Sequence, residues 1–454
     1  MAKPSIPQGT RDFSADTVRK RNYVFNTIRS VFELYGFEPL ETPAMENLDT
    51  LMGKYGEEGD KLIFKILNNG ISDPKNIEKS KAGFEKVLEG KSSSDLTERA
   101  LKYDLTIPFA RHVAMNHGRL TFPYRRYQVQ PVWRADRPQK GRYREFTQCD
   151  ADVVGSTALT NEVEFCHIYN EVFNKLGLWD YELKINSRKI LTALATICGG
   201  ASKMTDITVA IDKLDKIGLD RVKEELAERA LTEQQIAIIE KYLLITGTNE
   251  EKLTQITSLI GHIETGKKGI EEIKWVYQQA ANVRLQIDFT LARGLNYYTG
   301  IILEAKAPAE VKMGSIGGGG RYDDLTGLFD LPGMAGVGIS FGVDRIYDVM
   351  EELQLFPEAV QSGTKAIFFN MGETESQFAF NIMQQLRGKG ISCEMYHEFA
   401  KISKQFSYAD KKKIQYAVII GSKEIEQKYC LVKNLSTGLQ EVIIFDQLFA
   451  YFNK

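Results

Sequence analysis

The sequence has few features of a secreted, membrane-bound or disulfide-stabilised protein. Its 454 residues include only five cysteines, an odd number, widely scattered and without a Cys-x-x-Cys pair. Neither a disulfide framework nor a thiolate zinc site is therefore expected, and a reducing cytoplasm is the simplest interpretation. The first residues, MAKPSIPQGTRDF, lack the apolar core of a signal peptide. No apolar run approaches the roughly 20 residues needed to cross a bilayer. We expect a cytoplasmic protein.

The composition excludes disorder and collagen-like structure, because 43% of the residues are hydrophobic and 26% are charged, which is ordinary for a globular protein. The length predicts two or three domains. The formal net charge is only −2. Any affinity for nucleic acid must therefore come from local basic patches rather than from the charge of the whole molecule.

Patterns of apolar residues predict α-helices and strands in the first part of the chain. Thr17 to Phe37 has the spacing of one helix face, ended by Gly36, and the segment from Phe37 to Thr42 resembles a strand that Pro43 stops. The polar segment Ile71 to Ser94 is expected to be an exposed insertion with one short helix. Short aromatic and β-branched runs between Leu105 and Val154 predict an antiparallel sheet.

Later segments change in character. Leu159 to Leu176 is predicted to be helical, and the block from Ser187 to Val283 is rich in Glu, Lys and Gln and almost free of proline, which indicates a helical insert. Strand character returns with Leu285 to Phe289 and Ile301 to Ala305. After a linker-like FPEAVQSGT, strands at 365–370, 391–395 and 416–420 alternate with helices. That βαβ pattern predicts a small separate α/β domain.

The most informative segment is basic and aromatic. From Arg119 to Arg144 there are eight Lys or Arg and one acid, Asp136, interleaved with five aromatic residues. Arginine suits phosphate because its planar fork makes two parallel charge-assisted bonds, and aromatic rings offer faces on which bases stack. Taken alone, the run is equally consistent with a solvated basic face.

The order of the residues within this run carries a resemblance. RADRPQKGRYREF, from Arg134 to Phe146, resembles motif two of the class II aminoacyl-tRNA synthetases. The helix and strand from Thr17 to Pro43 resemble motif one, and GVGISFGVDRIYDVM, with Gly342 and Arg345, resembles motif three. The three motifs stand in the order that this class requires.

Other segments resemble the histidyl-tRNA synthetases in particular. LARGLNYYTGIILEA, from Leu291 to Ala305, is similar to their first histidine signature, and GGGGRYDDL, from Gly317 to Leu325, is similar to the second. PQGTRDF and LKYDLT also match that family. One residue departs from the pattern, because Asn296 stands where the family usually has Asp.

The resemblance implies an α+β fold with an antiparallel sheet flanked by helices. Residues 1–186 would form the first part of a catalytic domain, 187–283 a helical insertion, 284–354 the second part of the catalytic domain, and 364–454 an α/β anticodon-binding domain. It also implies ATP, L-histidine and tRNA as substrates and a homodimer built on motif one. No residues cluster like metal ligands, so Mg²⁺ is expected to arrive with ATP.

The resemblance assigns roles to individual residues. Arg134 and Arg293 would be the catalytic clamps on the α-phosphate and the carboxylate. The other expected ATP contacts are Asp136, Arg142, Phe146 and Arg345, with Phe146 and Arg345 on either side of the adenine ring and Arg144 a further candidate near the terminal phosphates. The expected histidine contacts are Asp104, Leu105, Thr106, Arg134, Gln148, Asp152, Arg293, Tyr297 and Tyr298.

Within the histidine set, each group is matched to a part of the substrate. Asp104, Thr106 and Gln148 would accept hydrogen bonds from the α-ammonium. Asp152 and Tyr298 are the expected partners of the imidazole ring, because a buried polar ring left unpaired costs about 1–3 kcal/mol. Many bacterial members have Glu at the place of Asp152.

Recognition of tRNA is expected at the tip of the motif two loop, at Gln139 and Lys140, and in the C-terminal domain. The helical insertion is expected either to clamp the acceptor arm or to be a solvated spacer or dimer prop. The glycines at 317–320 are interpreted as a close approach of backbone to ligand rather than as a flexible loop. Tyr297 and Tyr298, taken alone, are better explained as core aromatics.

Two other functions are compatible with parts of the sequence. One is a class II synthetase for glycine, threonine or proline, which the RGLNYY and GGRYD segments disfavour. The other is a regulatory subunit of histidine biosynthesis, which binds histidine without charging tRNA. Such proteins typically lack the C-terminal domain and the motif arginines, whereas this chain has Arg134, Arg293 and Arg345.

Overall fold

The structure is a computed structural model that describes residues 3–55, 59–292, 297–361 and 363–453. Its contacts divide the chain into two compact units. The first contains Met1–Asp12 and Val24–Leu355, and the second contains Phe13–Tyr23 and Phe356–Lys454.

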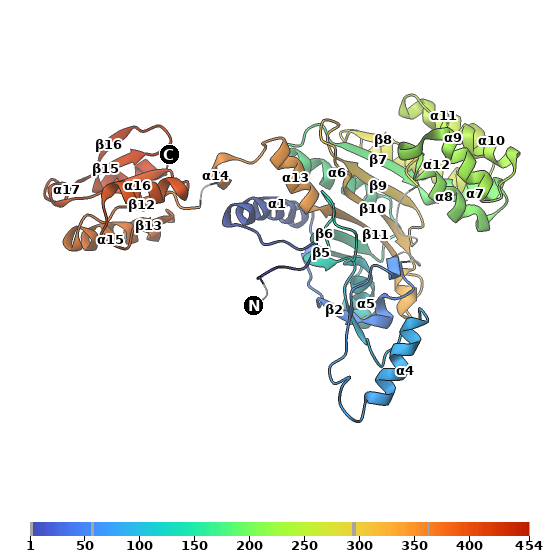
Figure 1. Ribbon diagram of the computed structural model, residues 1–454. Helices are drawn as coiled ribbons and strands as arrows, with labels where there is room; N and C mark the ends of the chain where they lie inside the picture. The colour runs from blue at the N-terminus through green and yellow to red at the C-terminus, as the bar shows by residue number, and fades with distance from the viewer. Residues whose placement is uncertain (1–2, 56–58, 293–296, 362, 454) are drawn as a thin grey trace. The chain divides into compact units, whose positions relative to one another are not determined.

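A large, mostly antiparallel sheet forms the centre of the first unit (Figure 1). From one edge to the other, its strands are β1 (Glu38–Pro39), β5 (Tyr124–Trp133), β6 (Glu145–Val154), β11 (Ala335–Gly342), β10 (Ser315–Asp323), β9 (Ile301–Lys306), β7 (Glu182–Ser187) and β8 (Leu285–Ile287). Only the edge pairs β1–β5 and β7–β8 are parallel. This sheet and its helices confirm the predicted α+β class.

Three helices lie against the sheet, and an aromatic core holds the first two of them. The helices are α1 (Ala15–Leu34), α6 (Thr160–Lys175) and α13 (Val343–Glu352). The fully buried ring of Phe341 on β11 lies 4.8 Å from that of Tyr169 and 5.6 Å from that of Phe173 on α6. Phe32 on α1 lies 5.8 Å from the same ring. Helix α1 is followed by Gly36 with φ +75°, a conformation that suits glycine and ends the helix as predicted.

A smaller sheet in the first unit has the strand order β2 (Met45–Asn47), β4 (Arg99–Leu101), β3 (Lys65–Ile66). The helices that accompany it are α2 (Leu48–Leu51), α4 (Ile77–Leu88), α5 (Thr106–Asn116), η1 (His117–Arg119) and η3 (Leu325–Phe329). Helix α4 lies within residues 71–94, so the prediction of one short helix in that segment is confirmed. Helix α5 matters most for function, because its first turn faces the cavities described below.

The helical segment lies at the β7–β8 edge of the large sheet (Figure 1). It comprises α7 (Arg188–Ile197), η2 (Ala201–Lys203), α8 (Met204–Ile211), α9 (Leu214–Glu228), α10 (Glu233–Leu243), α11 (Asn249–Ile260) and α12 (Glu264–Gln279). Capping boxes at Thr232 and Thr248 begin α10 and α11, because each threonine hydroxyl accepts from a backbone N–H three residues later.

The second unit has its own sheet and core. The strand order is β13 (Cys393–Met395), β12 (Ala366–Phe368), β14 (Tyr416–Ile419), β15 (Tyr429–Asn434), β16 (Gln440–Ile444). Its helices are α14 (Glu358–Gln361), α15 (Glu373–Gly388), α16 (Ile402–Lys411), α17 (Ser422–Glu426), η4 (Phe445–Gln447) and α18 (Leu448–Phe452). Strand β12 is parallel to both β13 and β14, which confirms the predicted βαβ pattern.

Three local predictions were wrong. The strand expected over Phe37–Thr42 is reduced to Glu38–Pro39, because the Thr42 N–H donates to the side chain of Gln130 instead of to a neighbouring strand. Part of the segment expected as sheet is α5, whose start Asp104 caps by accepting from the Ile107 N–H. The third concerns only the alternative of a flexible loop at the glycine run, which is strand β10; the favoured interpretation, a close approach of backbone to ligand, stays a prediction. Among the described residues, no helix is long and apolar enough to span a membrane.

Truncating the aromatic core should destabilise the first unit. Phe173 is fully buried, so Phe173→Ala is expected to lower the free energy of unfolding by about 3–5 kcal/mol through lost burial and a residual cavity. Phe84, which is 56% exposed on α4, is the control, and Phe84→Ala should cost no more than about 0.5 kcal/mol. Urea denaturation of both variants measures the difference, and equal costs would contradict the packing described here.

Candidate active site

Two adjoining cavities open on one face of the large sheet. The smaller, of about 110 Å³, is lined by Asp104, Thr106, Arg134, Gln148, Asp150, Asp152, Tyr297, Tyr298, Gly318, Gly319, Tyr322, Gly338, Ile339 and Ser340. The larger, of about 390 Å³, is lined by Leu62, Tyr103, Arg134, Asp136, Gly141, Arg142, Tyr143, Phe146, Gln148, Ser315, Ile316, Gly317, Gly318, Ser340, Gly342, Asp344 and Arg345. They share Arg134, Gln148, Gly318 and Ser340, so a ligand can extend from one into the other.

Strand β6 supplies one wall of the smaller cavity. Successive side chains of a strand point to opposite faces, so Gln148, Asp150 and Asp152 share one face. Their partners on β11 are Gly342, Ser340 and Gly338. A Cβ on Gly338 would lie 1.9 Å from Asp152 Oδ1, so glycine is required there to leave room for the carboxylate.

Arg134 lies where the cavities meet. Its guanidinium lies 4.2 Å from the centre of the Tyr103 ring and 5.2 Å from that of Phe146. Its Nε donates to the Tyr103 carbonyl at 3.1 Å. A stacked, backbone-anchored guanidinium is held in a fixed orientation, which suits bidentate binding of a phosphate or carboxylate.

Arg345 joins α13 to the loop between β5 and β6. Its Nε donates to the Gly141 carbonyl at 2.7 Å and its Nη1 to the Ser315 carbonyl at 2.6 Å. Tyr143 in the same loop donates to Asp348 of α13 at 3.0 Å. The loop that lines the larger cavity is thus fixed by helix α13.

Asp104 lies directly before the first turn of α5. Its Oδ1 accepts from the Tyr55 hydroxyl at 3.0 Å and from the Ile107 N–H at 3.1 Å. Its side chain is almost fully buried, and burial raises the pKa of this carboxyl.

Asp152 is held by two partners. Its Oδ2 lies 2.8 Å from Arg126 Nη2, and its Oδ1 accepts from the Tyr322 hydroxyl. All three side chains are buried, with Arg126 fully so. Burial raises the pKa of Asp152, and the positive charge of Arg126 opposes that rise.

Asp150 lies between Gln148 and Asp152 on the same face. Burial raises the pKa of its carboxyl from 3.8 to about 7, with Arg126 opposing the rise and Asp152 adding to it. The Ser340 hydroxyl donates to it, and Ser340 Oγ accepts in turn from Gln148 Nε2 at 3.2 Å. Its Oδ1 is buried and has no hydrogen-bond partner among the described residues.

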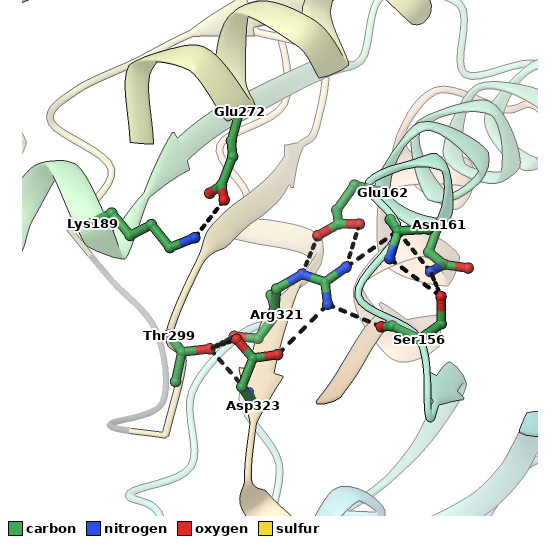
Figure 2. A network of polar contacts seen from close by, with 9 residues as sticks. Ser156, Asn161, Glu162, Lys189, Glu272, Thr299, Arg321 and Asp323 are labelled. Carbon is green, nitrogen blue, oxygen red and sulfur yellow. Dashed lines mark hydrogen bonds and ion pairs between the residues drawn. The ribbon is translucent and has the colours of Figure 1, made fainter. Parts of the chain in front are cut away.

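A second buried ion pair belongs to a polar network between β10 and α6, which Figure 2 shows. Arg321 on β10 donates to Glu162 on α6 through Nε at 2.6 Å and Nη2 at 2.8 Å. The neighbouring Asp323 Oδ2 accepts from the Thr299 hydroxyl at 3.0 Å, and the Thr299 N–H donates to the Arg321 carbonyl at 2.8 Å. Thr299 follows Tyr297 and Tyr298 directly, so this network fixes the position of both tyrosines.

Most of the residues predicted from the sequence lie together around the two cavities. The smaller cavity contains Asp104, Thr106, Arg134, Gln148, Asp152, Tyr297 and Tyr298, and the larger contains Arg134, Asp136, Arg142, Phe146 and Arg345. Leu105 is fully buried and is not among the lining residues, although its carbonyl accepts from Arg126. Arg293 and Asn296 lie outside the described residues.

The two residues predicted to meet tRNA, Gln139 and Lys140, are not among the lining residues of either cavity. The Gln139 N–H donates to the Arg142 carbonyl in the turn of the loop, and exposed Lys140 forms a 2.8 Å ion pair with Glu352. Arg144 holds the base of this loop, because its Nε donates to the Asp136 carbonyl at 3.1 Å.

The sequence interpretation missed Asp150, Ser340 and Tyr322, which also line the smaller cavity. For Asp150 the signal was available, because it stands between two predicted ligands at strand spacing. Nothing in the sequence places Tyr322 against Asp152, since that contact joins two strands 170 positions apart.

Comparisons with known proteins agree with this geometry. A sequence profile described as histidyl-tRNA synthetase matches residues 86–346, and a profile described as an anticodon binding domain matches residues 365–454. A histidine–tRNA ligase of Flavobacterium johnsoniae is 51% identical over 467 residues, which cover 98% of each chain. One of Bacteroides fragilis is 51% identical over 462 residues, which cover 100% of each chain.

A solved structure shares the whole fold. The crystal structure of histidyl-tRNA synthetase from Nostoc sp. PCC 7120 superimposes with a TM-score of 0.83 at 30% identity, covering 100% of this chain and 99% of that one. Fold and site together define a class II aminoacyl-tRNA synthetase. Within that class, the chain belongs to the histidyl-tRNA synthetase family.

The buried carboxyl of Asp150 should make the protein's stability depend on pH. The folded-state pKa is raised to about 7 from 3.8. At low pH this group therefore does not lower the free energy of unfolding. Above about pH 7 it lowers that free energy by the full amount, because Asp150 must then ionise while buried. We expect Asp150→Asn to raise the free energy of unfolding by roughly 2–4 kcal/mol at about pH 8, with the gain shrinking steadily towards about pH 5.

Denaturant unfolding across this pH range measures the effect. The control is Asp206→Asn, because Asp206 pairs with Arg229 at 3.1 Å on the partly exposed surface of the helical segment and should show no such gain. If Asp150→Asn is less stable than the parent protein at about pH 8, the charged form of Asp150 stabilises the fold and the prediction is wrong.

Proposed function

We propose that this protein is a histidine–tRNA ligase that activates L-histidine with ATP and transfers it to the 3′ end of its tRNA. The observation that carries the proposal is the junction of the two cavities at Arg134 and Gln148. A small acidic cavity suits an amino acid with a cationic and an N–H-bearing end. The larger cavity beside it suits a nucleotide.

In the first step, a carboxylate oxygen of histidine attacks the α-phosphorus of ATP. The bond to the bridging oxygen breaks, diphosphate leaves, and histidyl-adenylate remains. Negative charge builds up on the phosphoryl oxygens, so catalysis consists mainly of positioning and of electrostatic stabilisation. The stacked guanidinium of Arg134 is proposed to bind the α-phosphate and the carboxylate, with Arg293 as the second clamp.

The larger cavity is proposed to hold ATP. Phe146 offers a face for adenine and Arg345 a cation for its other face. Arg142, which lies 3.6 Å from Asp136, would turn towards the terminal phosphates. Mg²⁺ would arrive bound to those phosphates, as oxygen-rich ligands attract it.

The smaller cavity is proposed to hold the histidine. The α-ammonium carries three donors, and the acceptors around it are Asp104 Oδ2, Gln148 Oε1 and the Thr106 hydroxyl. The first two atoms are buried and have no hydrogen-bond partner among the described residues. Tyr297 and Tyr298 close the cavity, and Tyr298 is a proposed partner of the ring.

In the second step, a hydroxyl of the terminal ribose of tRNA attacks the carbonyl carbon of the adenylate, and AMP leaves. Gln139 and Lys140 are proposed to contact the acceptor end, and residues 364–454 the anticodon. We also propose the division of the chain at 1–186, 187–283, 284–354 and 364–454, a cytoplasmic location, and a homodimer built on motif one.

The amino acid and the clamps can be tested by ATP–diphosphate exchange with each proteinogenic amino acid in turn. We expect exchange with histidine alone. Arg134→Ala and Arg293→Ala should each lower it by about 10²–10³-fold, the usual cost of losing a transition-state donor. Arg284→Ala is the control, because Arg284 pairs with Asp180 on the exposed surface. A protein without exchange with any amino acid would end the enzyme proposal, and activity retained in Arg293→Ala would remove that clamp.

A variant of the motif two loop separates the two steps. Lys140→Ala should leave exchange unchanged while lowering kcat/KM for tRNA charging by about 3–10-fold, since a single exposed charge contributes modestly. Equal losses in exchange and charging would place Lys140 in the activation step instead.

The proposed homodimer predicts twice the chain mass, 51.4 kDa, in sedimentation equilibrium at micromolar concentration. A single species of 51.4 kDa over that range would contradict it.

A further inference from the structure

The first residues of the chain lie against the loop between β5 and β6, which lines the larger cavity. The Arg144 N–H of that loop donates to the Gly9 carbonyl at 2.9 Å. Gly9 has φ +85°, and a Cβ on it would lie 2.8 Å from Arg144 Cγ and 2.9 Å from Pro138 Cγ, so both its conformation and its packing favour glycine. The N-terminal segment is therefore fitted closely to this loop, although the sequence interpretation gave PQGTRDF no role of its own.

Arg11, in the same segment, contacts two residues of the larger cavity. Its guanidinium carbon lies 3.3 Å from the centre of the Tyr143 ring. Its Nη2 forms an ion pair with Oδ1 of Asp344, in the first turn of α13. Tyr143 and Asp344 line the larger cavity, and neither is among the lining residues of the smaller one. Arg11 is not among the lining residues of either cavity, so it acts on a ligand through these two neighbours.

Asp344 connects the two sides that are proposed to enclose adenine. Its Oδ2 accepts from the Thr147 N–H at 3.2 Å, and Thr147 directly follows Phe146. Arg345 directly follows Asp344 in α13 and donates to the Gly141 carbonyl at 2.7 Å. Because one carboxylate joins the Phe146 side to the Arg345 side, its position sets the width of the space between them.

The carboxylate of Asp344 needs a positive charge to keep that position. Its side chain is only 5% exposed. A buried carboxylate that loses its ion-pair partner is left uncompensated, and the groups around it then rearrange to restore contact with water. Arg11 supplies the charge, and its planar guanidinium lies over the Tyr143 ring at the same time, a combination that lysine does not offer.

We propose that Arg11 is a positioning residue of the ATP site. Through Asp344 and Tyr143 it sets the separation of Phe146 and Arg345, so that the adenine ring finds both faces of its site already in place. Preorganised groups bind a ligand more tightly, because less conformational freedom is lost when the ligand binds. The inference rests on the proposed function, and it gives a role to a residue outside both cavity linings.

The test measures ATP–diphosphate exchange by the full-length protein, with ATP varied at saturating histidine. Arg11→Ala should raise KM for ATP by about 10-fold, the usual effect of losing one charge-assisted hydrogen bond. The value of kcat and the KM for histidine should each change by less than about 3-fold, because the contacts of Arg11 lie at the nucleotide end of the site. Lys3→Ala is the control, because Lys3 is exposed in the same segment and should change none of these values.

Adenosine distinguishes the base site from the phosphate site. As a competitive inhibitor against ATP it reports on the base site alone, since it carries no phosphate. Arg11→Ala should raise the inhibition constant of adenosine by the same factor as the KM for ATP, about 10-fold, and should leave the KM for diphosphate within about 3-fold of the parent value. A general loss of structure would not produce this selectivity.

A double variant tests whether Arg11 acts through Asp344. Asp344→Asn keeps an acceptor for the Thr147 N–H and removes the charge that Arg11 faces. The double variant should raise KM for ATP by no more than about 2-fold beyond the larger single effect, whereas two independent effects would multiply. Multiplied effects would contradict the proposed route through Asp344.

Three results would overturn the proposal: the parent's KM for ATP in Arg11→Ala, equal rises in KM for ATP and for histidine, or an unchanged inhibition constant of adenosine. Absence of exchange in the parent protein would instead refute the proposed function, and calorimetric titration of ATP into the same variants would then decide on Arg11. Urea unfolding curves identify any variant that has lost its fold. If Arg11→Ala is one, Arg11→Lys decides, because it keeps the charge without the planar stack and should raise KM for ATP by about 3-fold.

Discussion

The smaller cavity depends on one buried positive charge. Arg126 is fully inaccessible to solvent, and its guanidinium faces a group of carboxyls that would otherwise repel one another. Its charge opposes the rise in the pKa of both Asp150 and Asp152 that burial causes. Removing one member of such a buried pair typically costs about 3–5 kcal/mol, because the remaining charge has no compensation. The acidic character of the cavity is therefore possible only with this arginine behind it.

The ion pair of Arg321 and Glu162 holds the segment of residues 297–300 in place, and the ion pair of Arg126 with Asp152 does the same for β6. Both pairs join a strand of the large sheet to a neighbouring element, and both arginines lie outside the lining of the cavity, to which Asp152 belongs. The GGRYD segment, which by resemblance marked the amino acid, thus acts partly through support. Its Arg321 never reaches a cavity lining, whereas its Tyr322 does.

Much of this arrangement could be predicted from the sequence, for identifiable reasons. Long periodic segments such as Thr160–Lys175 gave reliable helices, and the ordered motifs brought Arg134, Phe146 and Arg345 to one cavity. Short elements were less predictable, because the Thr42 N–H donates to the Gln130 side chain instead of to a strand, and because Asp104 accepts from the Ile107 N–H at the start of α5. The β15–β16 hairpin was not anticipated. Contacts between distant strands, such as Tyr322 with Asp152, carry no local signal at all.

The glycines of β10 have a consequence for how this site can change over time. A Cβ on Gly319 would lie 2.2 Å from the Gly338 carbonyl oxygen, whereas one on Gly318 would meet only the Leu303 carbonyl, at 3.4 Å. The cavity is thus bounded by main chain on this side, and its width is a property of the sheet rather than of any rotamer. Drift in sequence can alter the polarity of the opposite wall, on β6, residue by residue. On the side of β10 it cannot widen the cavity, because glycine has no side chain to shorten, so a change in the size of the accepted amino acid has to come from the other walls.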